Sequence, residues 1–292
     1  MSSATLPFQE YKWPIFRVLS VLFLAFLFLS HGRWLEVIFD KRVIQPFMLL
    51  VITPALFAAI RKENPAWPII ASCVPAGVVV GAFNLLEPLM DPTTAGSIAS
   101  PRVYSPIALG LVLSYSLRVF APAYESKPDT TGVFTFWTCL ISTIAIFAAY
   151  ILLNSAGAEL YINPRGVAFT VAVIACCFAF NDKARLTFGE VMARGGLFAC
   201  LLAAVYAVTL YTASAAADDP RGIGPALAES CSLLLYGALL AVAAGASGIR
   251  PALDRELLTR DWHLTEAYVF ITLIVFPPQT LRELLSASGA AG

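Results

Sequence analysis

The stretch DDPRGIGPALAESCSLLLYGALLAVAAGA, from Asp218 to Ala246, contains a turn, a helix start and a long apolar run. Pro225 suits the first turn of a helix, because the N–H that proline lacks would have no intrahelical partner there. The apolar run is about as long as a helix must be to cross a bilayer core of about 30 Å. One carboxylate, Glu229, interrupts the run about one turn after Pro225. The stretch therefore predicts a membrane-spanning helix with one ionisable side chain near its start.

The rest of the chain has a similarly apolar composition. Of its 292 residues, 59% are hydrophobic and 13% are charged, whereas a soluble domain has about 25% charged residues. Helices satisfy their own backbone hydrogen bonds in lipid, so this composition predicts an all-α, polytopic integral membrane helix bundle. The net charge is zero and gives no indication of nucleic-acid binding.

Eight apolar runs are expected to form membrane spans, the sixth of them short. They lie at about 15–30, 43–60, 67–90, 105–122, 133–153, 166–180, 197–217 and 224–246. A further apolar run, Ala267 to Phe276, is too short to span. We expect it to lie on the membrane within a short cytoplasmic helical tail at 247–292, with a re-entrant segment as the alternative.

The placement of Lys and Arg indicates the orientation of these spans. With the N-terminus in the cytoplasm, twelve of these residues fall in inner segments and six in outer segments, not counting Arg282 in the tail. Positive side chains are enriched on the cytoplasmic side of membrane proteins. The asymmetry therefore predicts a multi-pass protein with both termini in the cytoplasm.

The two halves of the chain carry similar turn signals in the same order. The corresponding pairs are Asp40-Lys41-Arg42 with Asn163-Pro164-Arg165, Asp91-Pro92 with Asp219-Pro220, and Ser105-Pro106 with Gly224-Pro225. In the last pair, each proline is expected to open the fourth helix of its half. These signals predict two parallel four-span repeats, at 1–123 and 133–246, with a linker at 124–132. The alternative is that apolar sequences resemble each other by composition alone.

Two stretches of the second half carry a resemblance to a known family. GAELYINPRGVAFTVAVIACCFAF, from Gly157 to Phe180, and DDPRGIGPALAESCSLLLYGALLA, from Asp218 to Ala241, resemble the MotA/TolQ/ExbB proton-channel family, most closely in IGPALA and LYGALLA. Proteins of this family form a ring around the helices of a small partner and couple ion flow to mechanical work. The resemblance implies an ion-conducting subunit of the bacterial inner membrane and a single-span partner that carries an Asp.

Two departures from the family pattern weaken the ionic part of this expectation. Only Asn181 to Gly196 stands where the family has a sizeable cytoplasmic insertion. Leu233 and Leu234 stand where the family places threonines, and leucine binds neither water nor an ion. Three functions therefore stay open: an ion-channel subunit, a non-conducting structural subunit of a larger complex, and a small-solute transporter.

The candidate ion-pathway residues are the polar side chains within the predicted spans: Glu229, Ser230, Ser232, Glu87 and Asn84. An ionisable side chain inside a span is costly and indicates a function. We expect Glu229 to face protein and to share a polar patch with Ser232, three residues further along the helix; the alternative is a solvated position near the membrane surface. Asn84 and Glu87 share a helix face and either line a polar cavity or reach the interface.

Small residues are expected where helices approach each other closely. Gly77-x-x-x-Gly81 has the spacing that allows such an approach, and we expect the same of Gly224, Pro225 and Gly237. The six cysteines lie in apolar runs without CxxC spacing and are interpreted as buried hydrophobes. No catalytic, metal or cofactor motif is visible, so we expect no enzyme activity, catalytic residue, metal or cofactor. Expected partners are membrane lipids, further copies of the chain, and other membrane proteins, including a small single-span protein.

Overall fold

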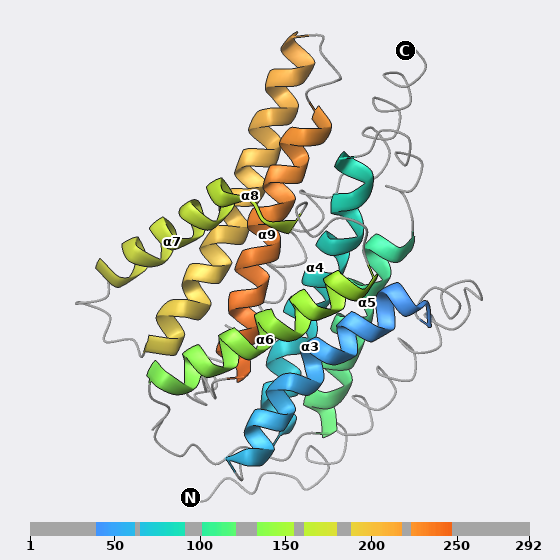
Figure 1. Ribbon diagram of the computed structural model, residues 1–292, viewed down its shortest axis with the longest axis vertical. Coiled ribbons are helices and arrows are strands. Elements are labelled where there is room, and N and C mark those ends of the chain that lie inside the picture. Colours follow the sequence, from blue (N-terminus) through green and yellow to red (C-terminus); the bar gives the residue numbers. More distant parts are fainter. Residues whose placement is uncertain are drawn as a thin grey trace, which may run out of the picture.

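The computed structural model describes seven α-helices and, within the residues it describes, no strand (Figure 1). The described residues are 39–61, 65–90, 101–120, 133–154, 161–179, 188–217 and 223–246. The helices are α3 (Lys41–Ile60), α4 (Ala66–Met90), α5 (Pro101–Phe120), α6 (Val133–Asn154), α7 (Pro164–Ala179), α8 (Phe188–Ala217) and α9 (Ile223–Ala246). The all-α class is confirmed. The predicted first span at 15–30, the linker at 124–132 and the tail at 247–292 lie outside the described residues.

Three of the described helices can cross a membrane by their length and composition. They are α3, the part of α4 from Pro68 to Leu86, and the part of α6 from Phe136 to Leu153. The apolar segments found in the other four helices are shorter: Arg102–Ser114, Pro164–Ala179, Arg194–Thr209 and Ala228–Ala244. The described residues thus contain three helices that are long and apolar enough to span a membrane, and the set of eight spans remains a prediction.

Four helices form a row at the centre of the bundle. α4 packs against α5 on one side and α9 on the other, and α9 packs in turn against α8. α3 and α6 pack against each other and cross obliquely over α4 and α9, while α7 lies against α8 and α9 (Figure 1). The order α5–α4–α9–α8 places the predicted third and fourth helices of each half beside each other.

The core lies where α4 meets its neighbours. Val78, Val79, Val80 and Leu86 of α4 are fully buried, and so is Leu234 of α9. The Cys231 thiol, also buried, donates to the Ala82 carbonyl oxygen at 3.8 Å and joins α9 to α4. In lipid, helices are held together mainly by such close packing, because lipid tails are as apolar as the side chains themselves.

The turns before α3 and α7 start these two helices in the same way. The Asp40 carboxylate accepts from the Arg42 N–H at 2.9 Å, and the Asn163 side-chain oxygen accepts from the Arg165 N–H at 3.0 Å. Asp and Asn are favoured at this capping position because their oxygen satisfies an N–H that has no partner within the helix. Each cap is followed, two residues later, by an arginine.

Two predicted helix starts are wrong. α5 begins at Pro101, so Pro106 lies inside the helix and does not open it. α8 begins at Phe188, nine residues before the expected start. In both cases the prediction followed the edge of an apolar run, whereas a helix extends into flanking residues wherever its backbone hydrogen bonds can form.

Candidate functional site

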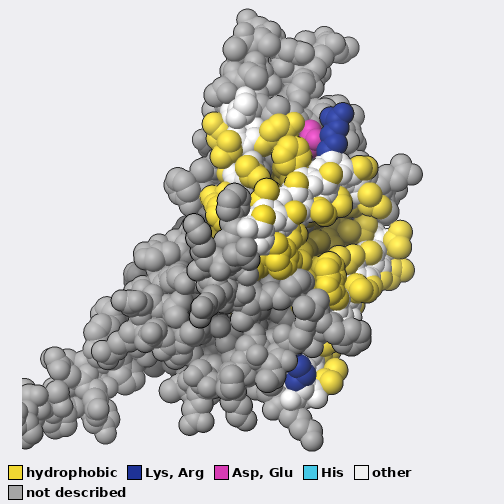
Figure 2. All heavy atoms as spheres, turned by 90° about the vertical axis from the view of Figure 1, so that its left-hand side faces the viewer, with side chains coloured by type: hydrophobic (Ala, Val, Ile, Leu, Met, Phe, Trp, Pro, Cys, Tyr) yellow, Lys and Arg dark blue, Asp and Glu magenta, His cyan; other side chains and the backbone are white. Residues whose placement is uncertain are grey.

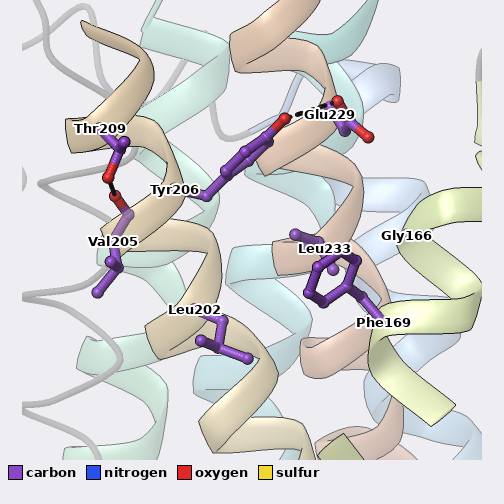
Figure 3. A pocket seen from close by; sticks show the side chains of 8 residues that line it. All are labelled: Gly166, Phe169, Leu202, Val205, Tyr206, Thr209, Glu229 and Leu233. Atoms are coloured by element: carbon purple, nitrogen blue, oxygen red, sulfur yellow. Dashed lines mark hydrogen bonds between the residues drawn. The ribbon is translucent and has the colours of Figure 1, made fainter. Parts of the chain in front are cut away.

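Glu229 lies on α9 and points toward α8. The Tyr206 hydroxyl of α8 donates a hydrogen bond to Glu229 Oε2 at 3.0 Å (Figure 3). The Glu229 side chain is partly buried. The prediction that Glu229 faces protein is therefore confirmed, and its partner is the helix that precedes it in the chain.

A cavity of about 200 Å³ surrounds this hydrogen bond. Its lining comes from α7, α8 and α9, namely Gly166, Phe169, Leu202, Val205, Tyr206, Thr209, Glu229 and Leu233 (Figure 3). Among these eight residues, Glu229 is the one that carries a charge. The Thr209 hydroxyl donates to the Val205 carbonyl oxygen of its own helix at 2.8 Å. The hydrogen bond that Glu229 accepts from the lining comes from Tyr206.

The cavity opens sideways, between α7 and α8. Phe169 of α7 is 59% exposed, and Val205 of α8 is 61% exposed. Figure 2 looks at the side of the molecule where α7 lies in Figure 1, and its described surface is largely hydrophobic, with one acidic side chain beside a basic one. In a membrane protein, an exposed apolar face of this kind is covered by lipid or by another protein.

Leu233 closes the cavity toward the middle of α9. It lies four residues after Glu229 on the same helix face and is nearly fully buried. Leu234, the other leucine at a position where the resembling family has threonine, is completely buried. Neither residue brings a hydroxyl group to the cavity.

The expected polar patch of Glu229 and Ser232 is absent, and this part of the prediction is wrong. The Ser232 hydroxyl is buried and donates to the Ala228 carbonyl oxygen of its own helix at 2.9 Å, as serine often does inside helices. Successive residues turn by about 100°, so the residue at i+4 lies closer to the direction of Glu229 than the residue at i+3 does. Leu233 occupies that place in the lining, while Ser230 is buried elsewhere.

Asn84 joins three helices and takes no part in the Glu229 cavity. Its side-chain amide donates to the carbonyl oxygens of Arg42 on α3 and Arg102 on α5, each at 3.3 Å. Pro46 and Pro106 stand four residues after these arginines, where each lacks the N–H that would bond to that carbonyl. The two N–H groups of this amide also serve the Val80 carbonyl oxygen of α4 at 3.0 Å, so Asn84 replaces the two missing backbone donors in part. The Glu87 side chain lies outside what the structure describes.

An ion pair stands beside Asn84. Arg102 contacts the Asp40 carboxylate at 2.7 Å, which ties the start of α5 to the start of α3. The Tyr150 hydroxyl of α6 donates to the Lys41 carbonyl oxygen at 3.3 Å and brings a fourth helix to the same place. This polar cluster thus binds helix ends together, and the interpretation of Asn84 as part of an ion pathway has no geometric support.

Two of the glycines predicted at helix contacts, Gly77 and Gly237, lie against the backbone of a neighbouring helix. A Cβ on Gly77 would collide with the Pro106 carbonyl oxygen of α5, and a Cβ on Gly237 would lie 2.5 Å from the Gly196 carbonyl oxygen of α8. Gly81 is buried. Gly224 and Pro225 lie in the first turn of α9. The sequence interpretation missed Gly110 and Gly196, which provide the matching contacts on α5 and α8; the Gly195-Gly196 pair was a visible signal for the second.

Tyr236 is a second residue that the sequence interpretation missed. Its hydroxyl donates to the Tyr161 carbonyl oxygen at 2.7 Å and accepts from the Asn163 N–H at 2.8 Å. The ring lies against Gly166, where a Cβ would be 3.0 Å from Tyr236 Cε2. Tyr236 therefore holds the start of α7 against α9 and fixes one wall of the Glu229 cavity.

Comparisons of the chain with family models, with curated proteins and with solved structures find no match. The similarity to MotA/TolQ/ExbB proteins therefore stays a resemblance of two sequence stretches.

Proposed function

We propose that the chain is an integral membrane subunit that acts as a structural scaffold and conducts no ions by itself. The closure of the Glu229 cavity by Leu233 is the observation that carries this proposal. An ion or proton path through a helix bundle needs a succession of polar groups or waters. In place of such groups, the cavity wall beside Glu229 contains the apolar side chains of Leu202, Phe169 and Leu233.

The composition of α9 beyond the cavity supports the same proposal. From Leu233 to Ala244, Tyr236 is the one residue with a polar side chain. Its hydroxyl is already engaged at the start of α7. No polar side chain of α9 is thus available in this segment to continue a path from Glu229 to the other end of the helix.

A proton-channel subunit of the MotA/TolQ/ExbB kind is the second candidate. Glu229 favours it, because its carboxylate faces a protein-lined cavity and accepts a hydrogen bond from Tyr206. In this version, a single-span partner helix would supply the ionisable group that α9 lacks beyond Leu233. We do not propose a small-solute transporter, because the cavity lies among α7, α8 and α9 of one half and not between the halves.

The same proposal includes the wider architecture expected from the sequence: two parallel four-span repeats, both termini in the cytoplasm, and a bacterial inner membrane location. The spacing of the close contacts supports the repeat. Cys73 follows Asp40 by 33 residues, and Gly196 follows Asn163 by 33 residues. The backbone carbonyls of Cys73 and Gly196 face Gly110 of α5 and Gly237 of α9, respectively.

Proton flux into liposomes that contain the purified chain tests the proposal. We expect no flux above that of empty liposomes under an imposed pH gradient, and no change with Glu229→Gln. Assembly is measured on the same preparations by the yield of the native complex, which the variant leaves intact or lowers. Flux in the unchanged protein that Glu229→Gln abolishes without loss of complex would overturn the scaffold proposal and favour the channel subunit.

A further inference from the structure

In the repeat proposed above, α4 corresponds to α8, and α5 corresponds to α9. One helix contact in each pair gives the register of this correspondence. The Cys73 carbonyl faces Gly110, and in the same way the Gly196 carbonyl faces Gly237. A residue of α8 therefore stands 123 positions after its counterpart on α4, and a residue of α9 stands 127 positions after its counterpart on α5.

A second contact in each pair has the same register. A Cβ on Gly77 of α4 would lie 2.9 Å from Ile107 Cα of α5. Their counterparts are Cys200 and Leu234, and the Cys200 thiol donates to the Leu234 carbonyl oxygen at 3.7 Å. The two helix pairs thus match residue by residue, so the surroundings of corresponding residues can be compared.

One stripe of apolar side chains is buried on α4 and exposed on α8. Ala82 lies in the middle of the α4 stripe, and its carbonyl oxygen accepts from the Cys231 thiol of α9. The residues of the α4 stripe are all buried: Pro75, Val78, Val79, Ala82 and Leu85. Their counterparts on α8 are between 38% and 61% exposed: Phe198, Leu201, Leu202, Val205 and Val208. The surface by which α4 meets α9 is therefore repeated on α8, where no described helix covers it in that way.

α5 carries the counterpart of the surface by which α9 covers α4. Cys231 belongs to a buried stripe of α9 with the residues that follow it at i+4 and i+7, Leu235 and Ala238. The corresponding residues of α5 are only partly buried: Tyr104, Ala108 and Leu111. α5 and α8 stand at opposite ends of the row (Figure 1). Each chain thus has one unfilled surface at one end of the row and the matching surface at the other end.

We infer that α5 of a second copy of the chain packs against α8 as α9 packs against α4 within one chain. The row then continues from one copy into the next. Such a contact is heterologous, because it uses a different surface on each copy. Lipid would satisfy the apolar character of α8 equally well, but only a helix with the stripe of α9 or α5 matches its surface in shape.

The second copy also completes the Glu229 cavity. Tyr104 corresponds to Cys231, which meets Ala82, and Ala82 corresponds to Val205. Tyr104 of the second copy therefore lies beside Val205. Because Leu202 and Val205 line the cavity as well as its open side, the docked α5 forms the outer wall that one chain alone does not provide.

Cross-linking of introduced cysteines in membranes tests this contact. A chain with Tyr104→Cys is expressed together with a differently tagged chain with Val205→Cys. In both chains, Cys176 and Cys177 are replaced by serine, because the other four cysteines are buried. Mild oxidation with copper phenanthroline is expected to give a covalent dimer that carries both tags, while each chain expressed alone gives none. A disulfide needs two Cβ atoms about 4 Å apart, so the product reports this particular contact.

Leu153→Cys is the matched control for Val205→Cys. Leu153 is 84% exposed on α6, which lies outside the row, and together with Tyr104→Cys it is expected to give no dimer. A folded pair of chains with Tyr104→Cys and Val205→Cys that gives no dimer would overturn the inference. A dimer formed by Val205→Cys alone, or a cross-link from Val205→Cys to a different protein, would do the same.

The mass of the complex in mild detergent gives a second test that needs no cysteine. The unchanged protein is expected to contain more than one copy by native mass spectrometry, and Val205→Trp is expected to release single chains, because the larger ring holds α5 of the second copy away. An unchanged protein that is a single chain, or a complex that Val205→Trp leaves whole, contradicts the inference. Proton flux is measured separately, so the scaffold proposal can fail while this contact is confirmed, and the reverse.

Discussion

Helices α4 and α5 touch at Gly77 and Gly110, and helices α8 and α9 touch at Gly196 and Gly237. In each pair, a glycine on one helix faces a backbone carbonyl of the other, so the two backbones lie as close as a missing side chain allows. The two pairs also lie next to each other in the row, through the contact of α4 with α9.

The surroundings of the two pairs differ. The side of α4 that faces away from α5 is covered by α9, and α3 also packs against α4. Val79 and Ala82 of α4 are therefore fully buried. The outer side of α8 is covered only in part by α7, and Val205 stays 61% exposed. The charged cavity of Glu229 lies on this open side. The difference shows that both pairs use the same type of helix contact, while the neighbours of each pair decide where a polar side chain can reach the outer surface of the bundle.

The largest expected effect comes from adding one methyl group at the helix contacts. Gly196→Ala and Gly77→Ala each place a Cβ against a backbone carbonyl, which cannot move without separating the helices. We expect each to cost about 1–3 kcal/mol of the free energy of unfolding, or more. Thermal unfolding in detergent, followed by the fraction that remains folded, measures the loss.

Gly195→Ala is the matched control for this pair of variants. A Cβ at Gly195 would meet Ile174 Cγ1 at 3.0 Å, a side-chain atom that can shift more easily than a backbone carbonyl. It is therefore expected to cost much less than Gly196→Ala on the next residue. If Gly77→Ala destabilises the protein and Gly196→Ala does not, the two helix pairs are not equivalent and the comparison fails.

A smaller effect is expected from Asn84, which joins the helices around the first pair. Asn84→Leu keeps the approximate size of the side chain. It removes the amide that donates hydrogen bonds to the Arg42 and Arg102 carbonyl oxygens. We expect a loss of about 1–2 kcal/mol in the free energy of unfolding, because these hydrogen bonds are exposed and water can replace part of what is lost. The control is Thr209→Ala, since the Thr209 hydroxyl donates to the Val205 carbonyl oxygen of its own exposed turn. Asn84→Leu as stable as the unchanged protein would show that water or another group serves these carbonyls.

The sequence predicted where the described helices lie, apart from the starts of α5 and α8, but it did not predict which helices are neighbours. The apolar run gave α6 to within one residue, 133–153 against Val133–Asn154, and α9 likewise. The sequence did not predict that α4 would pack against α9, because an apolar helix has several faces that are equally suited to packing. The role of Asn84 could have been predicted, since Pro46 and Pro106 each remove the donor to a carbonyl four residues earlier. The partner of Glu229 depends on the rotation of α8, which no residue pattern specified.

The smallest expected effect concerns two tyrosine hydroxyls on the two sides of the Glu229 cavity. Tyr236→Phe removes two hydrogen bonds, to the Tyr161 carbonyl oxygen and from the Asn163 N–H, at a partly buried joint. It is expected to cost about 1 kcal/mol of the free energy of unfolding, near the typical net value of an internal hydrogen bond.

Tyr206→Phe removes one hydrogen bond, to a Glu229 carboxylate that lies on the open side of α8 and stays partly exposed. Water can replace the lost donor there, so thermal unfolding should shift little or not at all. The two variants differ from the unchanged protein by one oxygen atom each, which makes them a matched pair. If Tyr206→Phe costs more than Tyr236→Phe, then Glu229 is less accessible than its cavity indicates, and the contrast between a covered and an open helix pair does not extend to the site.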